Sequence, residues 1–252
     1  MAKVHVVINQ KGGVGKTLIA MNLGAVTADV VGRSPSNDSQ IAVASSDPQG
    51  SAIWWANQVR DLPFEVLSIH SDMDAIRDLR DWPYRHVFVD TPGWLPLKED
   101  ELEAGRDPLG EGPVGDMLRA ILDQADDAIV PILTEPQSYE PTWNTIEQVL
   151  RPRGLDFQVV MNNWPPQEGI AYVEGTRAFC EQYGWPVANT VIRRYRAHSN
   201  ASVQGRVVTM YNANRVELQA REDFYRFALE HGLNGASGKV TEIQRQVEES
   251  AN

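Results

Sequence analysis

The segment Lys11–Thr17 carries the clearest chemistry in this sequence. It reads Lys-Gly-Gly-Val-Gly-Lys-Thr and stands between an apolar run, Val4–Ile8, and a stretch with helical spacing of apolar residues, Thr17–Val31. Glycines let a backbone curl until successive N–H groups point at one anion, and the N-terminus of a helix adds a favourable dipole. A strand, a glycine-rich turn ending in Lys-Thr and a helix together predict a phosphate-binding loop.

Each residue of this loop has an expected role. The Lys16 ammonium is expected to reach the β- and γ-phosphates of a nucleotide, and the Thr17 hydroxyl to ligate Mg²⁺. Two ammonium groups near the same phosphates need strong anionic compensation. Lys11 therefore either serves the nucleotide of a neighbouring subunit or is a solvated surface lysine. The predicted nucleotide-binding residues of the loop are Lys11, Gly12, Gly13, Val14, Gly15, Lys16, Thr17 and Leu18.

Three further polar residues follow apolar runs and are candidates for the same site. Asp47 comes shortly after Ile41–Ala44, and Asp90 ends the run that starts at His86. Ligands gather at the carboxyl ends of parallel strands. We expect Asp90 to bind Mg²⁺ through water or through Thr17, and Asp47 to orient the attacking water or to hold a water on Mg²⁺. Asn162 is predicted to contact the adenine, or else to be an ordinary turn asparagine.

The elements that must position these residues are short apolar runs alternating with longer helix-like stretches. Most runs are continuous and rich in Val and Ile, which is typical of parallel strands buried on both faces. The pattern predicts an α/β fold: a single doubly wound, mostly parallel sheet with helices on both faces, formed by residues 1–234 and followed by a tail or frayed helix at 235–252. The predicted strands are Val4–Ile8, Ile41–Ala44, Glu65–Ile69, His86–Val89, Ala128–Leu133, Phe157–Met161 and Val187–Ile192.

Three other segments have weaker signals. Lys98–Asp116 is acidic and rich in Gly and Pro, which predicts a long loop that is either functional or a tolerated insertion. Thr142–Leu150 and Val216–Leu229 are predicted to be surface helices. The second has a partial apolar face that is expected to pack on the core and not to form a groove for a partner, made of Leu218, Phe224, Phe227 and Ala228.

Composition excludes several classes of protein. The chain has 252 residues, 42% of them hydrophobic, and one cysteine, Cys180, which excludes a disulfide framework or a multi-cysteine metal site within one chain. The apolar runs are strand-sized, so we expect no membrane helix and a cytoplasmic protein. The net charge of −11 argues against a protein that coats nucleic acid by bulk attraction.

Three motifs together resemble the ParA/MinD family of deviant Walker-type ATPases. They are the loop Lys11–Thr17, the sequence Asp-Pro-Gln-Gly-Ser at Asp47–Ser51 and the strand with its polar end at His86–Gly93. The resemblance implies an ATP- and Mg²⁺-dependent ATPase. It also implies an ATP-sandwich homodimer in which the first lysine of the loop crosses to the partner's phosphates. The catalytic residues implied are Lys11, Lys16 and Asp47.

Three positions depart from the usual pattern. Gln10 stands where a phosphate loop normally has its first glycine, and Ser45 where the family usually has an acid. Gly93 replaces the second proline of the family's Asp-Thr-Pro-Pro.

The flanks are most like the small plasmid-partition ParA proteins that lack an N-terminal DNA-binding domain. The last residues are acidic and weakly apolar, so no membrane-targeting helix is expected. The resemblance implies a nucleoid-associated protein that binds DNA non-specifically and segregates plasmid DNA with a centromere-binding, ParB-like adaptor. A positioning ATPase for a protein cargo is the alternative, and a small-molecule kinase or ligase on the same fold is another.

A local basic zone is the candidate DNA surface. Between Arg193 and Arg226 there are seven arginines against three acids, Glu217, Glu222 and Asp223. The guanidinium fork suits phosphate contacts, and a handful of such contacts predicts weak, salt-sensitive DNA binding. The alternative is a solvated face in which arginines pair with those acids. The candidate DNA-binding residues are Arg193, Arg194, Arg196, Arg206 and Arg221.

Overall fold

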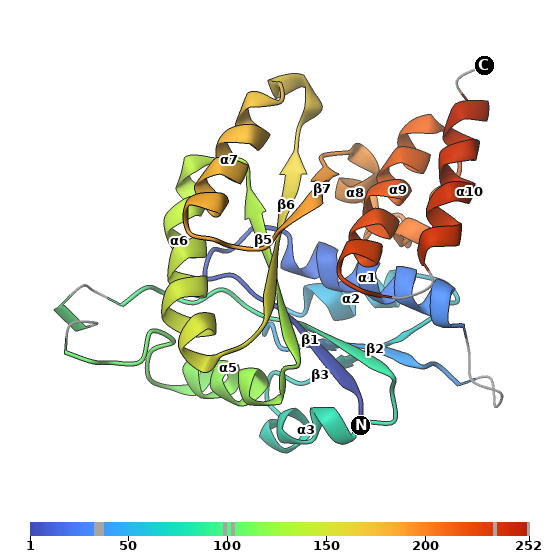
Figure 1. Cartoon of the computed structure of the whole chain (residues 1–252). Helices are drawn as coiled ribbons and strands as arrows, with labels where there is room; N and C mark the ends of the chain where they lie inside the picture. Colours follow the sequence, from blue (N-terminus) through green and yellow to red (C-terminus); the bar gives the residue numbers. More distant parts are fainter. Residues whose placement is uncertain (33–37, 98–99, 102–103, 234–235, 251–252) are drawn as a thin grey trace.

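The centre of the molecule is a seven-stranded parallel sheet with strand order β3-β2-β4-β1-β5-β6-β7. The computed structural model describes residues 1–32, 38–97, 100–101, 104–233 and 236–250. All seven predicted strands and the α/β fold class are confirmed (Figure 1). The strands are β1 Lys3–Val7, β2 Ile41–Ser45, β3 Glu65–Ser68, β4 His86–Asp90, β5 Asp127–Leu133, β6 Phe157–Trp164 and β7 Val187–Arg193.

Helices cover both faces of the sheet and bury two separate apolar clusters (Figure 1). Successive side chains of a strand point to opposite faces, so Val6 joins one cluster and Val7 the other. One face carries α1 Lys16–Val31, α2 Ser51–Gln58, α8 Arg196–Asn200, α9 Arg215–Glu230 and α10 Ala236–Glu249. The other carries α3 Met73–Arg77, α5 Pro113–Gln124, α6 Tyr139–Trp143 with a π-helical continuation at Asn144–Leu150, and α7 Ala171–Gln182.

Helix α1 is buried on nearly all sides. The sequence predicted one apolar stripe, but Met21 and Ala25 are as fully buried as Leu23. The reason is that α1 contacts α2, α9 and α10 as well as strands β1, β2 and β4. Helix α9 is the predicted helix Val216–Leu229, and Phe224 and Phe227 of its apolar face are completely buried, as expected of core packing. It is less exposed than a surface helix, because α10 packs against it and Asp223 is buried as well.

Two segments behave differently from simple loops. The stretch Lys98–Asp116 lies partly outside the described residues, and its last four residues form the first turn of α5, which begins at Pro113. Proline suits that position because its missing N–H has no partner in the first turn of a helix. Beyond α9, helix α10 spans Ala236–Glu249, with Ile243 fully buried. Within the described ranges, the helices are too short or too polar to cross a bilayer.

Candidate functional site

The loop between β1 and α1 has the conformation that its glycines permit. Gly13 and Gly15 adopt φ values of 77° and 91°, which side chains disfavour. Asn162, at the carboxyl end of β6, donates from Nδ2 to the Val14 carbonyl at 2.7 Å, and a Cβ on Gly15 would collide with this amide. The Asn162 side chain therefore fixes the loop through the Val14 carbonyl. Because its amide lies beside Gly15, there is no room for a side chain at position 15.

The entrance of the loop is held by side chains from α6 and its π-helical continuation. Asn9 donates from Nδ2 to Thr142 Oγ1 and accepts the Lys11 N–H, both at 2.9 Å. The Gln10 N–H donates to Thr145 Oγ1 at 2.9 Å. π-Helical segments are often found at functional sites, and this one brings Thr145 under the loop. The sequence analysis did not predict the contacts of Thr142 and Thr145 with the loop. The one sign of them in the sequence is the polar pair Asn9-Gln10 directly after an apolar strand.

Lys16 is positioned over the loop and shielded from water. Its side chain is buried, and Nζ donates to the carbonyls of Asn9 and Lys11, both at 3.0 Å. Burial lowers the Lys16 pKa, and the nearby charges of Asp90 and Asp47 partly restore it. Within the described residues this buried ammonium donates to backbone carbonyls and to no carboxylate, so it can pair with an anion placed on the loop.

The residues predicted to place Mg²⁺ meet beside Lys16. Thr17 Oγ1 donates to Asp90 Oδ2 at 2.8 Å, as expected from the sequence. Asp90 is completely buried, and its Oδ1 has no hydrogen-bond partner within the described part of the chain. Burial raises the Asp90 pKa to about 7. The Ser45 hydroxyl, on the residue paired with Asp90 across β2 and β4, is likewise buried without a partner.

These orphaned oxygens fit a hydrated Mg²⁺ ion. Mg²⁺ prefers oxygen ligands and keeps several of its waters, so a buried carboxylate with a free oxygen next to a hydroxyl is a suitable seat. A cation beside Asp90 would offset the burial that raises its pKa. The Ser45 hydroxyl can accept from or donate to such a water, although it lacks the negative charge that an acid would supply there.

Asp47 stands at the rim of the same site. Its Oδ1 accepts the Gln49 N–H at 2.9 Å, which fixes the turn leading through Gly50 into α2. Its side chain is partly exposed, and its charge acts on both Lys16 and Asp90. The structure therefore brings Asp47 close enough to Lys16 and Asp90 for its charge to act on both.

The segment after β4 lies directly against the loop. A Cβ on Gly93 would lie 2.7 Å from the Gln10 carbonyl, and the Trp94 N–H donates to this same oxygen at 3.3 Å. The close approach accounts for glycine where the related motif has proline. It also couples the backbone after Asp90 to the loop, because the Gln10 carbonyl contacts both Gly93 and the Trp94 N–H.

Lys11 points away from the centre of the loop. Its Nζ donates to the Gln137 carbonyl at 3.0 Å, in an exposed hydrogen bond. Lys11 and Lys16 thus face different partners in the isolated chain, in agreement with the expectation that they do not serve one phosphate group together.

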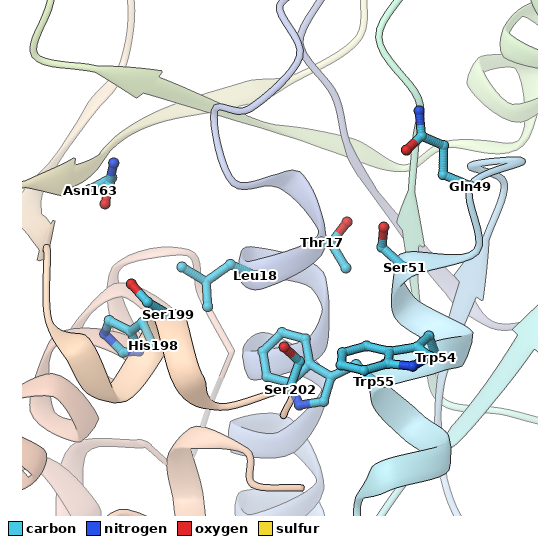
Figure 2. Close-up of a pocket in the computed structure, with 10 residues that line it drawn as sticks. All are labelled: Thr17, Leu18, Gln49, Ser51, Trp54, Trp55, Asn163, His198, Ser199 and Ser202. Carbon is cyan, nitrogen blue, oxygen red and sulfur yellow. The ribbon is translucent and has the colours of Figure 1, made fainter. Parts of the chain in front are cut away.

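A cavity of about 490 Å³ opens beside the start of α1, lined by residues of α1, α2 and α8 (Figure 2). This volume lies within the range of small-molecule pockets, which is roughly 300–1,000 Å³. Asn163, next to the loop-holding Asn162, faces the cavity, and Trp54 is half exposed there. The lining residues are Thr17, Leu18, Gln49, Ser51, Trp54, Trp55, Asn163, His198, Ser199 and Ser202.

His198 in this lining is buried and has no partner for either ring nitrogen among the described residues. It packs between the rings of Tyr211 and Phe224, and burial lowers its pKa from the usual 6.5 to about 4. The folded chain therefore keeps this imidazole neutral at pH values where the unfolded chain protonates it.

Acid is expected to destabilise the fold through His198. The unfolded chain takes up a proton as the pH falls through 6.5, whereas the folded chain does so only near 4, so stability is lost between these values, by about 3 kcal/mol in all. Urea unfolding of wild type and His198→Phe at pH 7 and pH 5 measures this loss of stability. Between these two pH values the free energy of unfolding should fall by about 2 kcal/mol less in the variant than in wild type. His70→Phe, at an exposed histidine, is the control, and equal losses in wild type and His198→Phe contradict the assignment.

The five candidate DNA-binding arginines fall into two groups. Arg193 forms a two-pronged ion pair with Asp223, as close as 2.6 Å, and Arg206 does the same with Glu217 at 2.7 Å. The Arg221 guanidinium lies 5.4 Å from the centre of the Tyr225 ring. Arg193 and Arg206 are paired with acids, as the alternative of an acid-paired face anticipated, whereas Arg221 lies against an aromatic ring.

Arg194 and Arg196 are exposed and line one surface pocket together with Gln167 and Asn200. Neither takes part in a salt bridge within the described ranges of the chain. They lie at the end of β7 and the start of α8, the helix that also carries His198 into the cavity beside α1.

Sequence comparison finds two relatives that extend along most of the chain. The chain is 28% identical over 230 residues to the "Maintenance of carboxysome distribution protein A" of Gloeobacter kilaueensis, covering 90% of this chain and 93% of the relative. It is 25% identical over 207 residues to the protein of the same name from Halothiobacillus neapolitanus, covering 79% and 83%. No protein-family model matches the chain.

Structural comparison finds the same fold in several ATP-binding proteins. The cell division ATPase MinD of Pyrococcus furiosus superposes with a TM-score of 0.62 at 17% identity, covering 92% of this chain and 99% of that one. The McdA(D38A)–ATP complex of Cyanothece gives 0.61 at 13% identity (94% and 96%). A putative plasmid partition protein of Borrelia burgdorferi bound to AMPPNP gives 0.61 at 12% (92% and 100%). At these identities the likeness establishes the MinD/ParA P-loop fold.

Proposed function

We propose that this chain, a deviant Walker-type ATPase of the ParA/MinD family, uses ATP to distribute a protein cargo within the cell. The observation that carries the proposal is the 28% identity along nine-tenths of the chain to a carboxysome distribution protein. The expectation of plasmid DNA as cargo gives way to the alternative of a protein cargo. The Borrelia partition protein shares the fold at 12% identity only, which says nothing about cargo.

The loop residues support the ATPase part of the proposal. The exposed loop N–H groups at Gly12 and Gly13 are available to a triphosphate, and the buried Lys16 ammonium stabilises charge on its terminal phosphate. Thr17 and Asp90 would hold Mg²⁺, which supplies charge neutralisation at the β- and γ-phosphates. Asp47 orients the water that attacks. The cavity next to Leu18 has the size and the flanking aromatic and amide groups for the nucleoside.

ATP-dependent dimerisation is the switch in this proposal. Lys11 is held by a single exposed hydrogen bond to the Gln137 carbonyl, so releasing it costs little. In an ATP-sandwich dimer it would pair with the partner's phosphates, and hydrolysis would remove the group that the two subunits share. Two states are then biased by the presence of the γ-phosphate.

Non-specific DNA is the proposed track on which the dimer is retained. Arg194 and Arg196 are the proposed contacts because they are exposed and outside ion pairs, whereas Arg193 and Arg206 are engaged by acids. Two arginines per subunit give about four phosphate contacts in a dimer but only about two in a monomer, whose net charge of −11 further weakens its attraction to DNA. DNA retention is thereby tied to ATP.

Arg194→Glu is expected to weaken DNA retention by roughly 10- to 100-fold with ATP and to reduce the slope of log affinity against log salt by about two, one for each subunit. The measurement is DNA binding with ATP, with ADP and without nucleotide across a salt series. Arg77→Glu, which makes the same charge change on α3 at the opposite face of the sheet, is the control. If both variants lose affinity equally, net charge rather than a local surface governs binding.

Removing the gene from its host tests the cargo directly. We expect a large protein assembly to cluster or to be inherited unevenly, while resident plasmids are lost no faster than before. Fluorescent tagging of the assembly and plasmid-loss counts over many generations provide the two readouts. Evenly spaced assemblies with accelerated plasmid loss would return the protein to plasmid partition.

A further inference from the structure

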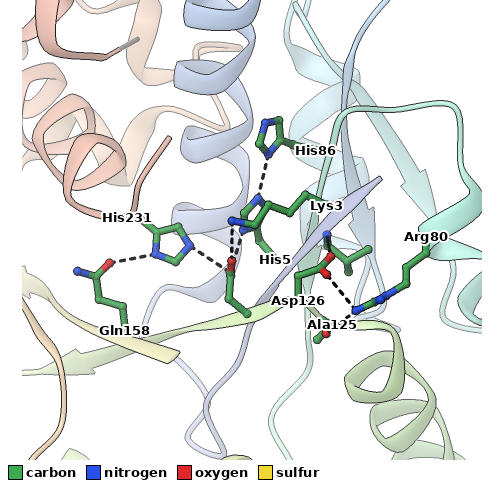
Figure 3. A network of polar contacts seen from close by, with 10 residues as sticks. Lys3, His5, Arg80, His86, Ala125, Asp126, Gln158 and His231 are labelled. Carbon is green, nitrogen blue, oxygen red and sulfur yellow. Dashed lines mark hydrogen bonds and ion pairs between the residues drawn. The ribbon is translucent and has the colours of Figure 1, made fainter. Parts of the chain in front are cut away.

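A second polar cluster lies toward the amino ends of β1, β4 and β5, whereas the phosphate loop follows the carboxyl end of β1. Figure 3 shows the side chains of this cluster. His5 of β1 and His231, just after α9, both direct a ring nitrogen at Asp127 of β5. The distances to Asp127 Oδ1 are 2.8 Å from His5 Nδ1 and 3.1 Å from His231 Nε2. Two nitrogens and one carboxylate oxygen, from three separate segments, therefore lie within 4.8 Å of one another.

The cluster is screened from water and its outer atoms are fixed. The His5 side chain is fully buried, and those of His231 and Asp127 are 6% and 14% exposed. The outer nitrogen of His5, Nε2, lies 3.0 Å from His86 Nδ1, and the outer nitrogen of His231, Nδ1, lies 3.0 Å from Gln158 Oε1. Metal-bound histidines commonly hold their second nitrogen in this way, which fixes the ring and the tautomer.

The count of protons exposes a conflict at His231. A 180° turn of the Gln158 amide would reverse this contact, but with Oε1 facing the ring, as in the structure, His231 Nδ1 carries a hydrogen. A neutral imidazole has only one such hydrogen, and Nε2 then presents a lone pair to the Asp127 carboxylate. Two facing lone pairs at 3.1 Å repel each other in a buried site. A positive centre must lie between them, which is either a second proton on His231 or a metal ion.

The convergence of donors favours the metal ion. Protons on His5 Nδ1 and His231 Nε2 would make two separate hydrogen bonds to Asp127 Oδ1, whereas one metal ion would use all three atoms at once. Two imidazole nitrogens and a carboxylate form a ligand set suited to Zn²⁺ and its neighbours, which accept a water as the fourth ligand. Lys3 Nζ lies 3.3 Å from the other oxygen, Asp127 Oδ2, but half of its side chain is exposed, so it can withdraw.

We propose that His5 Nδ1, His231 Nε2 and Asp127 Oδ1 form a binding site for one transition-metal ion of the Zn²⁺ class. The site would join β1 and β5 to the residue that follows α9, and so fasten the helix that covers α1 to the sheet. It is separate from the proposed Mg²⁺ seat at Thr17 and Asp90, whose donors are all oxygens. The proposal does not depend on the proposed function.

The test is titration of the chelator-treated full chain with Co²⁺ and with Zn²⁺, with Mg²⁺ and ADP in excess to occupy the nucleotide site. We expect one ion per chain, a visible Co²⁺ spectrum typical of four-coordinate nitrogen and oxygen ligation, and a rise in melting temperature with Zn²⁺. His231→Gln should lower the affinity at least tenfold. His70→Gln, at an exposed histidine on a loop, should leave it unchanged.

Two measurements keep the proposal open to refutation even where a variant folds poorly. Equal affinity in the two variants, or no binding by wild type, would mean that only adventitious surface sites take up the ions. Nitrogen-15 NMR of wild type gives an independent answer. A doubly protonated His231 ring in zinc-loaded protein at pH 7, or a neutral ring protonated at Nε2, overturns the site, whereas a ring protonated only at Nδ1 supports it.

Discussion

Replacing Lys16 by alanine is expected to weaken ATP binding about 100-fold. The Nζ atom is the buried positive charge that the structure places over the loop, and a charged hydrogen bond of this kind contributes roughly 1.5–3 kcal/mol. Because the ammonium is shielded from water, its interaction with a phosphate is stronger than at an exposed site. Titration with a fluorescent ATP analogue measures the loss.

The control for this variant must separate binding from folding. Lys16→Ala also leaves the Asn9 and Lys11 carbonyls without their donor, so a thermal melt must show that the variant is folded at the temperature of the titration. Lys11→Ala offers a matched comparison within the same loop, since Lys11 Nζ faces the Gln137 carbonyl. Wild-type affinity in a folded Lys16→Ala protein would remove Lys16 from the phosphate site.

The features that the sequence predicted well are those encoded by neighbouring residues. The strand before the loop, the glycines of the loop and the helix after it form one local unit, so their spacing is sufficient to place Lys16 and Thr17. Thr17 and Asp90 were expected to meet at one magnesium site, with Asp90 reaching the ion through water or through Thr17, because parallel strands bring their carboxyl ends to one edge. The structure shows them in contact although 73 residues separate them.

The features that the sequence did not predict depend on packing between distant segments. Thr145 supports the Gln10 N–H across 135 residues, and nothing near Thr145 in the chain indicates that its hydroxyl faces the loop. The arginine zone is a similar case. Arg193 finds Asp223 through the packing of α9 against β7, which composition alone cannot distinguish from a free basic surface.

The burial of α1 and α9 also depends on packing between distant segments, which the sequence did not predict. A helix in contact with a sheet on one side is expected to have one apolar stripe, and α1 and α9 were interpreted in that way. The structure adds α10 on the outside of α9, so residues on further sides of both helices are buried. The sequence of α1, with no charged residue between Lys16 and Asp29, was the available sign that it lies in the interior.

Replacing Lys11 by alanine is expected to leave a chain that binds ATP but no longer dimerises on it. Among the described residues the Lys11 side chain makes one hydrogen bond, the exposed one to the Gln137 carbonyl, and an alanine keeps the backbone contacts, so the change should alter neither the fold nor the ATP affinity of the monomer appreciably. In the proposed dimer two copies of Lys11 each pair with the partner's phosphates. At roughly 1.5–3 kcal/mol each, the dimerisation constant should fall roughly 100- to 10,000-fold.

Light scattering coupled to size-exclusion chromatography, with a slowly hydrolysed ATP analogue, measures this change over a range of protein concentrations. Lys11→Arg keeps the positive charge and should retain part of the dimer, which separates loss of charge from damage to the loop. An analogue-bound Lys11→Ala protein that still dimerises at wild-type concentrations would show that the subunits meet elsewhere. Dimerisation would then no longer depend on a shared phosphate, and the tie between hydrolysis and release from DNA through Arg194 and Arg196 would be lost.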